Sequence, residues 1–387
     1  MIYFLSHPIQ YFSPLFKVLA KAIRLKVFYY SNVSITGNID AGFGTEVKWD
    51  LPLLEGYESE LLPNWRKAKP LNNKFWDVFN PGVIKRLWKS SDKIVVVNGW
   101  TYSSNILVIV FGKLFKKKIW LRAESPLNQE LKKSKNILLL KTITLKYILF
   151  PLFIDKVMYI GSQNKKFYQY YGITDESRYV FTPYSVDNDR FTKEFETLKS
   201  QKNELKSSLG IPKGRKVILY SGKYISKKRP MDLLSAFLLF PANEHVLIFM
   251  GEGELRTNME LFVRENDLKN VVLTGFVNQS DVSKYYSIAD VFVMCSGSGE
   301  TWGLAVNEAM NFSLPVVVSD TTGCSSDLVK HGENGLLYEE GDISGLYNCI
   351  EKILNDSNLA STMGVQSAQI IKNYSFDAVN ENILAAL

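Results

Sequence analysis

A chain of 387 residues, 46% of them hydrophobic and 22% charged, has the size and composition of a globular protein with two domains of ordinary length. Residues 1–200 contain 30 Lys and Arg and 17 Asp and Glu, a net charge of +13. Residues 201–387 contain the remaining 16 Lys and Arg and 22 Asp and Glu, a net charge of −6. This asymmetry predicts two domains with different partners, the first an anionic surface, and the absence of any nucleic-acid-binding motif argues against nucleic acid as that partner.

Two features of the sequence indicate the compartment. The three cysteines, Cys295, Cys324 and Cys349, have no metal-binding spacing, and so sparse and odd a set fits a reducing compartment. The start, residues 1–6, lacks the basic residues of a signal peptide and is expected to form a first strand. We therefore expect a cytoplasmic protein, peripheral at the inner face of the cell membrane if its basic first domain contacts anionic lipid.

The first half of the chain alternates short apolar runs with helical patterns, which is typical of a doubly wound parallel sheet. The expected strands are Ile2–Leu5, Leu25–Tyr30, Ile94–Val97, Ile119–Leu121 and Val157–Ile160, and the expected helices are Pro14–Ile23, Ser103–Phe115, Lys135–Leu152 and Gly161–Tyr171. His7 directly follows the first strand, and open α/β sheets bind their ligands at the carboxyl ends of strands. His7 is therefore either a residue of an acceptor site or a loop histidine that caps local structure.

A long apolar run, Ile137–Ile154, is interrupted by Lys141 and Lys146. These two charges and Pro151 argue against a helix that spans a membrane. Most stretches of this kind are buried core helices, and a minority lie in the membrane interface with lysines that reach anionic headgroups. The basic first half of the chain favours the second alternative more than composition alone would.

The second half repeats the strand-and-helix alternation after a polar connector helix over residues 192–210. The expected strands are Val217–Tyr220, His245–Met250, Val271–Thr274, Val291–Met294 and Leu314–Val318, and the expected helices include residues 304–312, 343–355 and about 376–387. We therefore expect a second parallel sheet covered by helices.

A glycine- and serine-rich turn, residues 296–303, connects the strand Val291–Met294 to the helix that starts at Leu304. Such a turn is an anion site, because unpaired N–H groups meet the positive end of the helix dipole there. Glu300 lies in the turn, and Glu308 lies about one and a half turns into the helix, roughly 8 Å along its axis. A nucleoside diphosphate sugar has matching parts, with a diphosphate between sugar hydroxyls and ribose hydroxyls.

The pair Glu300 and Glu308, spaced E-x7-E, resembles the retaining nucleotide-sugar glycosyltransferases of family 4, within the glycosyl transferases group 1, which have the GT-B fold. Further segments match elements of that family in the same order: residues 181–191, 221–230, 250–256, 273–277 and 319–338. The resemblance is good over residues 180–345 and looser over 1–180.

The resemblance implies two Rossmann-like domains that face each other across a cleft. They would be an acceptor-binding domain over residues 1–185 and a nucleotide-sugar-binding domain over 186–372, with a C-terminal helix over 373–387 that returns to the first domain. It implies retaining transfer from a nucleoside diphosphate sugar to a glycan or lipid-linked acceptor, without a metal or other cofactor. A role in bacterial surface polysaccharide or glycan biosynthesis fits such an enzyme.

The same resemblance implies a role for each matched residue. Lys223 and Lys228 align with the two cations that hold the diphosphate, Glu300 lies against the transferred sugar, and Glu308 binds the ribose. The expected donor-binding residues are Gly222, Gly253, Phe276, Val277, Thr301, Trp302, Gly303, Leu304 and Glu308. The alternative without a function is a solvated basic loop for the lysines and a solvated helix face for the glutamates.

The chain departs from the family in its first half. His7 stands in the loop where many relatives have a glycine-rich turn that reaches the donor diphosphate. Gly42 and Gly44 either contact the diphosphate in its place or form a surface turn. Where many relatives place a histidine at a strand end, this chain has Arg122 and Glu124, which could contact the acceptor or the donor sugar.

Two aspartates, Asp187 and Asp189, have a spacing that suggests a metal site. They lie in a turn before the connector helix, and we expect them to cap and bridge that turn instead.

Two other functions share the expected fold. A GT-B epimerase would act on the nucleotide sugar without an acceptor, and a catalytically silent subunit would keep only the fold. The intact set of Lys223, Lys228, Glu300 and Glu308 argues against the silent subunit.

Overall fold

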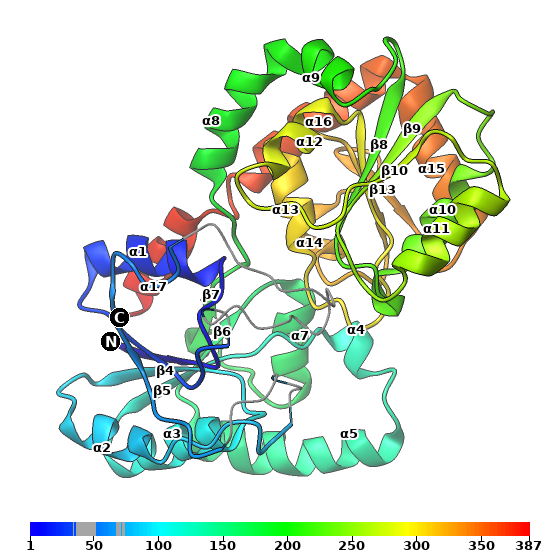
Figure 1. The fold of residues 1–387 in the computed structure, drawn as a ribbon. Helices are drawn as coiled ribbons and strands as arrows, with labels where there is room; N and C mark the ends of the chain where they lie inside the picture. Colours follow the sequence, from blue (N-terminus) through cyan, green and yellow to red (C-terminus); the bar gives the residue numbers. More distant parts are fainter. Residues whose placement is uncertain (34, 36–51, 67–70, 72–73) are drawn as a thin grey trace. The chain divides into compact units, whose positions relative to one another are not determined.

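The computed structural model describes residues 1–33, 35, 52–66, 71 and 74–387, which divide into two compact units (Figure 1). The first unit contains the described residues up to Pro183 together with Phe376–Leu387, and the second contains Tyr184–Ser375. Each unit has its own parallel sheet with helices on both faces.

The first unit is built on a seven-stranded parallel sheet in the order β3-β2-β1-β4-β5-β6-β7. Its strands are β1 Ile2–Leu5, β2 Lys26–Tyr29, β3 Glu58–Leu61, β4 Ile94–Asn98, β5 Lys118–Arg122, β6 Lys156–Tyr159 and β7 Tyr179–Phe181. Its helices are α1 Phe12–Ala22, α2 Gly82–Lys89, α3 Ser103–Leu114, α4 Leu127–Glu130, α5 Lys135–Lys141, the π-helix η1 Thr142–Leu149, α6 Phe150–Phe153, α7 Ser162–Tyr170, the 3₁₀ turn η2 Glu176–Arg178 and α17 Phe376–Ala386.

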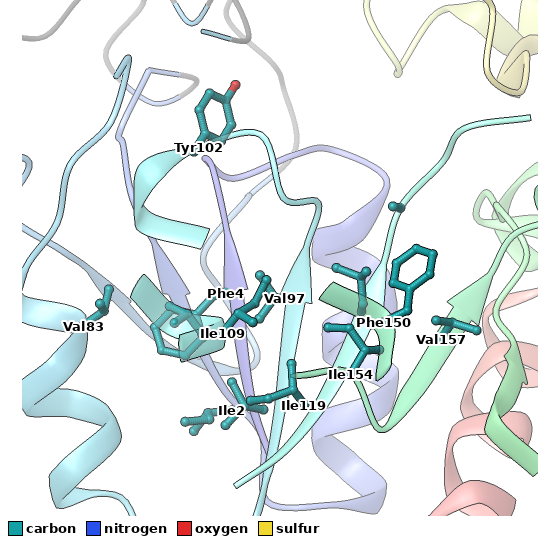
Figure 2. Packing of buried hydrophobic residues seen from close by; sticks show 14 of the residues in the cluster. Ile2, Phe4, Val83, Val97, Tyr102, Ile109, Ile119, Phe150, Ile154 and Val157 are labelled. Carbon is teal, nitrogen blue, oxygen red and sulfur yellow. The ribbon is translucent and has the colours of Figure 1, made fainter. Parts of the chain in front are cut away.

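The central strands bury side chains on both faces of this sheet, which explains their unbroken apolar sequences. Figure 2 shows one face, where Phe4, Val97 and Ile119 lie with Ile109 of α3 and Phe150 of α6 in a common core. The other face belongs to a second core made of alternate strand residues and of α1 and α17. Side-chain alternation along each strand therefore divides the unit into two hydrophobic layers.

The last helix, α17, packs against α1 and β7 of the first unit. Its buried residues Phe376, Val379 and Ile383 belong to the same core as Tyr3 and Trp120, and Lys156 Nζ donates a hydrogen bond of 2.8 Å to Ala386 O. The predicted return of the C-terminal helix to the first domain is confirmed.

The second unit has a six-stranded parallel sheet in the order β10-β9-β8-β11-β12-β13. Its strands are β8 Lys216–Ser221, β9 His245–Met250, β10 Val271–Leu273, β11 Val291–Met294, β12 Val316–Ser319 and β13 Gly335–Tyr338. Its helices are α8 Asn188–Leu198, η3 Lys199–Gln201, α9 Lys202–Ser208, η4 Ser226–Lys228, α10 Pro230–Phe237, α11 Arg256–Glu265, α12 Val282–Ile288, α13 Leu304–Asn311, α14 Ser325–Leu328, α15 Ile343–Asn355 and α16 Ser357–Ile371.

In both sheets the chain first builds outward in one direction and then crosses to build in the other. The crossing points lie between β1 and β4 and between β8 and β11. Loops at such a switch point leave the sheet in opposite directions and open a crevice at the carboxyl ends of the strands, where doubly wound proteins bind ligands.

Sequence patterns did not indicate the edge strands β3, β7 and β13 or the helices α2 and α16. Strand β3 has the sequence Glu-Ser-Glu-Leu and carries no fully buried residue, so it has no apolar run to detect. Strands β7, Tyr-Val-Phe, and β13, Gly-Leu-Leu-Tyr, are apolar, but runs of three or four residues are too short to be distinguished from other structure by their pattern.

Of the two alternatives left open for Ile137–Ile154, the structure contradicts the buried core helix. The segment Lys135–Phe153 is one continuous helix through α5, η1 and α6, long and apolar enough by length and composition to cross a membrane, and only 11% of its most apolar window is buried. Leu145 and Phe150 point into the core, whereas most of the other apolar side chains face outward.

Candidate active site

The two loops that flank the switch point of the second sheet are joined to each other. One follows β8 and contains Lys227 and Lys228, and the other follows β11 and contains Glu300. Lys227 O accepts a hydrogen bond of 2.9 Å from Gly297 N, and Lys227 Nζ donates to Gly299 O at 3.5 Å. Residues about 70 positions apart in sequence are thereby held in one wall of the crevice.

Lys228 and Glu300 form an ion pair between these loops. Their side chains are 16% and 12% exposed, so the pair is largely withdrawn from water while still accessible from the crevice. A cation and a carboxylate from two different loops are thus brought to one point, as the sequence resemblance predicts for the diphosphate and sugar ends of a donor.

The neighbouring Arg229 forms ion pairs with other residues. Its Nε donates to Asp232 Oδ2 at 2.6 Å, and its Nη1 lies 3.5 Å from Glu340 Oε1. Both partners belong to the scaffold around α10 and β13, so Arg229 stabilises the base of the loop, whereas Lys228 pairs with Glu300 of the other loop.

Glycines allow the Glu300 turn to pack closely. Gly303 adopts φ +110° at the N-terminus of α13, a conformation that residues with a side chain rarely adopt. A Cβ at this position would lie 2.6 Å from Met294 Sδ. Gly323 N donates to Glu300 O at 3.0 Å, and a Cβ on Gly323 would lie 1.9 Å from Thr301 O. The turn therefore delivers the N–H groups of Thr301–Leu304 to the start of α13 in a fixed arrangement.

Trp302 contributes to the scaffold through its side chain. Its indole is 2% exposed and donates a 2.8 Å hydrogen bond to Asn307 Oδ1. Asn307 Nδ2 in turn donates to Tyr184 O at 3.0 Å. Of the predicted contacts from Trp302 to a donor, only its backbone is available.

Glu308 lies in a polar network on the inner face of α13. Its Oε2 accepts a 2.7 Å hydrogen bond from Tyr286 Oη, and its Oε1 accepts a 3.3 Å bond from Gln279 Nε2. Arg190 holds Gln279 through bonds of 2.8 Å to its carbonyl and 2.7 Å to its side chain. Burial raises the pKa of the Glu308 carboxyl, while the bonds from Tyr286 and Gln279 oppose that rise.

Sequence reasoning missed Tyr286, Gln279 and Arg190. They come from α12, the loop before it and α8, and no motif joins them. A residue that orients a carboxylate without touching a ligand leaves no local pattern, although such partners often decide how the carboxylate acts.

The remaining predicted donor residues lie on loops that leave the same sheet. Gly222 and Lys223 follow β8, Gly253 follows β9, and Phe276 and Val277 follow β10, all at carboxyl ends of strands. A Cβ on Gly253 would lie 2.6 Å from Tyr224 O, so the loops after β8 and β9 are in close backbone contact there.

Asp187 acts as a helix cap, as predicted. Its side chain accepts a 3.0 Å hydrogen bond from Arg190 N at the start of α8, and Asp189 lies in the first turn of that helix. Within the part of the chain that the structure describes, no group of three or more His, Cys, Asp and Glu side chains gathers as metal ligands would.

In the first unit, the three predicted acceptor-side residues line one cavity of ≈ 570 Å³. His7 follows β1, and its Nδ1 lies 2.9 Å from Ser6 Oγ. Arg122 ends β5 with 2% exposure, donates to Thr182 O at 2.9 Å and approaches Glu124 Oε1 at 4.0 Å. These loops leave β1 and β5 on either side of the switch strand β4.

Two asparagines that the sequence did not single out also line this cavity. Asn98 ends β4 and Asn105 lies in the first turn of α3, with Asn105 Nδ2 donating to Asn98 O at 3.1 Å. Across the described residues, neither Asn98 Oδ1 nor Asn105 Oδ1 has a hydrogen-bond partner, although both atoms are buried. A buried amide oxygen without a partner is costly, and a bound hydroxyl would satisfy it.

Lys133 and Lys141 complete the rim of the cavity. Both pair with Glu130, which is 1% exposed, at 2.8 and 2.7 Å, and Tyr171 Oη donates to the same carboxylate at 2.9 Å. The two lysines outweigh the single negative charge of Glu130, which leaves a net positive charge at the rim. Gly42 and Gly44, the glycines considered for the donor diphosphate, lie outside the described residues.

Most of the second unit is similar to known proteins in sequence. Residues 201–369 match the family described as glycosyl transferases group 1. The capsular polysaccharide biosynthesis glycosyltransferase CapM of Staphylococcus aureus is 30% identical over 163 residues, 41% of each chain. The sulfoquinovosyl transferase SQD2 of Arabidopsis thaliana is 28% identical over 202 residues, 51% of this chain and 37% of its own. These matches span less than half the length of either relative.

Solved structures match the whole fold at low identity. HepE of Anabaena, in complex with UDP, superimposes over 100% of both chains with a TM-score of 0.75 and 16% identity. Sucrose-phosphate synthase of Thermosynechococcus elongatus covers 99% of this chain and 97% of its own, with a TM-score of 0.73 and 19% identity. The chain therefore has the GT-B fold expected from its sequence.

Proposed function

We propose that the protein, whose residues 201–369 match the family glycosyl transferases group 1, transfers a sugar from a nucleoside diphosphate sugar to a hydroxyl group of an acceptor. The observation that carries this proposal is the meeting of Lys228, Glu300 and the N-terminus of α13 beside the switch point of the second sheet. A catalyst of glycosyl transfer needs fixed positive groups beside the leaving diphosphate, and this arrangement supplies them.

We assign the donor residues as follows. Lys223, Lys228 and the N–H groups of Thr301–Leu304 neutralise the diphosphate as the bond to the anomeric carbon breaks. Glu300 faces the sugar, and Lys228 moves from Glu300 to the phosphate when the donor binds. Glu308, held by Tyr286 and Gln279, accepts hydrogen bonds from the ribose hydroxyls.

The proposed reaction retains the configuration of the sugar. The bond from the anomeric carbon to the diphosphate oxygen breaks, the bond to the acceptor oxygen forms on the same face, and the departing phosphate takes the acceptor proton. Electrostatic stabilisation of the leaving group comes from the protein, so the proposal includes no metal ion.

The acceptor is proposed to bind in the cavity of the first unit. The unpaired amide oxygens of Asn98 and Asn105 can accept hydrogen bonds from sugar hydroxyls, and Arg122 and Glu124 add charged groups to the same wall. A glycan or lipid-linked acceptor in surface polysaccharide biosynthesis fits this chemistry, and the name of the relative CapM supports that class. We place the reaction in the cytoplasm, since the cysteine content fits a reducing compartment.

A two-step experiment tests the function. UDP-, GDP- and ADP-sugars are first screened by thermal shift, and each donor that binds is then incubated with glycan and lipid-linked acceptors for analysis of the product linkage. An α-linked product from an α-linked donor supports retaining transfer. An inverted product contradicts the proposed stereochemistry, conversion of the donor without an acceptor indicates an epimerase, and absence of any donor binding contradicts the proposal as a whole.

A further inference from the structure

The helix Lys135–Phe153 presents an apolar surface to the outside of the first unit. Seven of its large apolar side chains are exposed by 47–63%: Ile137, Leu139, Leu140, Ile143, Tyr147, Ile148 and Leu152. A surface helix of a globular protein normally turns charged and polar residues outward, so this exposure calls for a partner.

The apolar surface continues onto neighbouring helices. Helix α3 contacts both α2 and α6, and Figure 1 shows α2, α3 and α5 on the same side of the sheet of this unit. Trp88 of α2 and Leu114 of α3 are 72% and 67% exposed there. Tryptophan and tyrosine side chains favour the boundary between lipid headgroups and acyl chains.

Positive charge surrounds this surface. Residues 101–150 contain ten Lys and Arg against two Glu, a net charge of +8 that exceeds the +7 of the whole chain. Lys132, Lys133 and Lys135 stand at the start of the helix, Lys146 lies within it, and further lysines precede it in the chain at residues 113 and 116–118. Long lysine side chains can lay their methylene groups along apolar surface while their amines reach anionic headgroups.

The helix cannot span a bilayer in this fold. It connects β5 to β6, which pair directly with Trp120 opposite Lys156, and it ends at Phe153, close to the start of β6. Leu145 and Phe150 are buried in the core, and Lys141 is paired with the buried Glu130. Since one side of the helix is occupied by protein, only the outer side can meet lipid.

We infer that the outer face of α5, η1 and α6, together with Trp88 and Leu114, docks in the plane of an anionic membrane surface. The exposed apolar side chains enter the headgroup boundary, and the lysines bind acidic lipids. The charge argues against a second copy of this chain as the occupant, because two faces with this excess of lysine would repel each other.

Flotation of the full chain with vesicles tests this surface. The protein should float with vesicles of phosphatidylcholine and phosphatidylglycerol, should stay in solution with phosphatidylcholine alone, and should release as salt rises. The double variant Leu140→Glu with Ile143→Glu should lose flotation. Leu239→Glu with Val365→Glu is the matched control, because both residues are 50% exposed in the second unit, and it should float like the wild type.

A charge-neutralising pair separates the electrostatic from the apolar contribution. Lys135→Gln with Lys146→Gln should lower the partition coefficient about 25-fold, at about fivefold for each lysine near the surface. Lys213→Gln with Lys372→Gln, exposed lysines of the second unit, should have little effect.

The inference fails if the wild type does not float with phosphatidylglycerol at low salt, or if the Leu140 and Ile143 variant floats normally. It also fails if light scattering shows that the wild type is a dimer, that the Leu140 and Ile143 variant is a monomer, and that neither binds vesicles. That result would identify a second copy of the chain as the occupant of this surface. Far-UV circular dichroism and nucleoside diphosphate binding verify that each variant is folded. Because that binding is measured without lipid, failure of docking leaves the proposed transferase reaction unaffected.

Discussion

Replacement of Lys228 by alanine is expected to cripple sugar transfer while leaving the protein folded. Lys228 pairs with Glu300, which lies in the turn before the N-terminus of α13. Loss of a charge partner to the leaving diphosphate should remove about 2–4 kcal/mol of transition-state stabilisation. At 1.36 kcal/mol for each factor of ten, kcat/KM should fall roughly 30- to 1,000-fold.

The same change has a smaller effect on stability. Removal of one partner from a fully buried ion pair costs about 3–5 kcal/mol. Lys228 and Glu300 keep 16% and 12% of their side-chain surface exposed, so water can reach the carboxylate that remains. We expect a loss of about 1–2 kcal/mol in the free energy of unfolding, which leaves a folded enzyme for assay.

Lys227 provides the matched control for this prediction. It belongs to the same loop and carries the same charge, but it is exposed, and its amine makes only a 3.5 Å bond to Gly299 O. Lys227→Ala should keep turnover close to that of the wild type. Initial rates of product formation at several donor concentrations measure both variants, and the role of Lys228 is refuted if Lys228→Ala turns over within a few-fold of the wild type.

The other predictions concern the two glutamates and metal ions. Glu300→Gln should mainly lower kcat and should bind the nucleoside diphosphate almost normally. Glu308→Ala should raise KM and should bind the nucleoside diphosphate clearly worse. The opposite ranking of the two affinities in calorimetry would mean that the donor lies in the reverse direction. Burial raises the pKa of Glu308, and the ionised form accepts ribose hydrogen bonds best, so donor affinity should increase as pH rises through that raised pKa. Glu308→Gln should remove this pH dependence, and its persistence would assign it to another group. Activity should survive EDTA. If EDTA abolished activity and Mg²⁺ or Mn²⁺ restored it, a metal site at Asp187 and Asp189 would be indicated.

The local patterns of the second half were sufficient to locate the strands and loops that carry the candidate donor residues. Buried parallel strands such as β9 and β11 are unbroken apolar runs, so their ends could be located to the residue. Glycine-rich and basic loops follow those ends, and the chemistry of a phosphate site lies mostly in backbone N–H groups and lysines on such loops. The strand order, which places β8 beside β11, then brings the loops with Lys228 and Glu300 to the same edge of the sheet.

The acceptor half was less predictable because its residues are brought together from separate strands. His7, Arg122 and Glu124 were identified as candidates from strand ends, and the structure places them on one cavity. Asn98 and Asn105 carry no motif, and only the packing around them shows that their amide oxygens lack a partner within the described residues.

By itself, the sequence determined the fold class, the strands of both sheet centres and the loops that carry the donor chemistry, because these depend on local composition and on chain order. Tertiary structure alone decided which partners complete the site, such as Tyr286 for Glu308 and Lys228 for Glu300, since these contacts join distant segments. It also decided that the apolar helix Lys135–Phe153 is exposed. An apolar run has the same composition whether protein or lipid covers it, and what covers it depends on the rest of the fold.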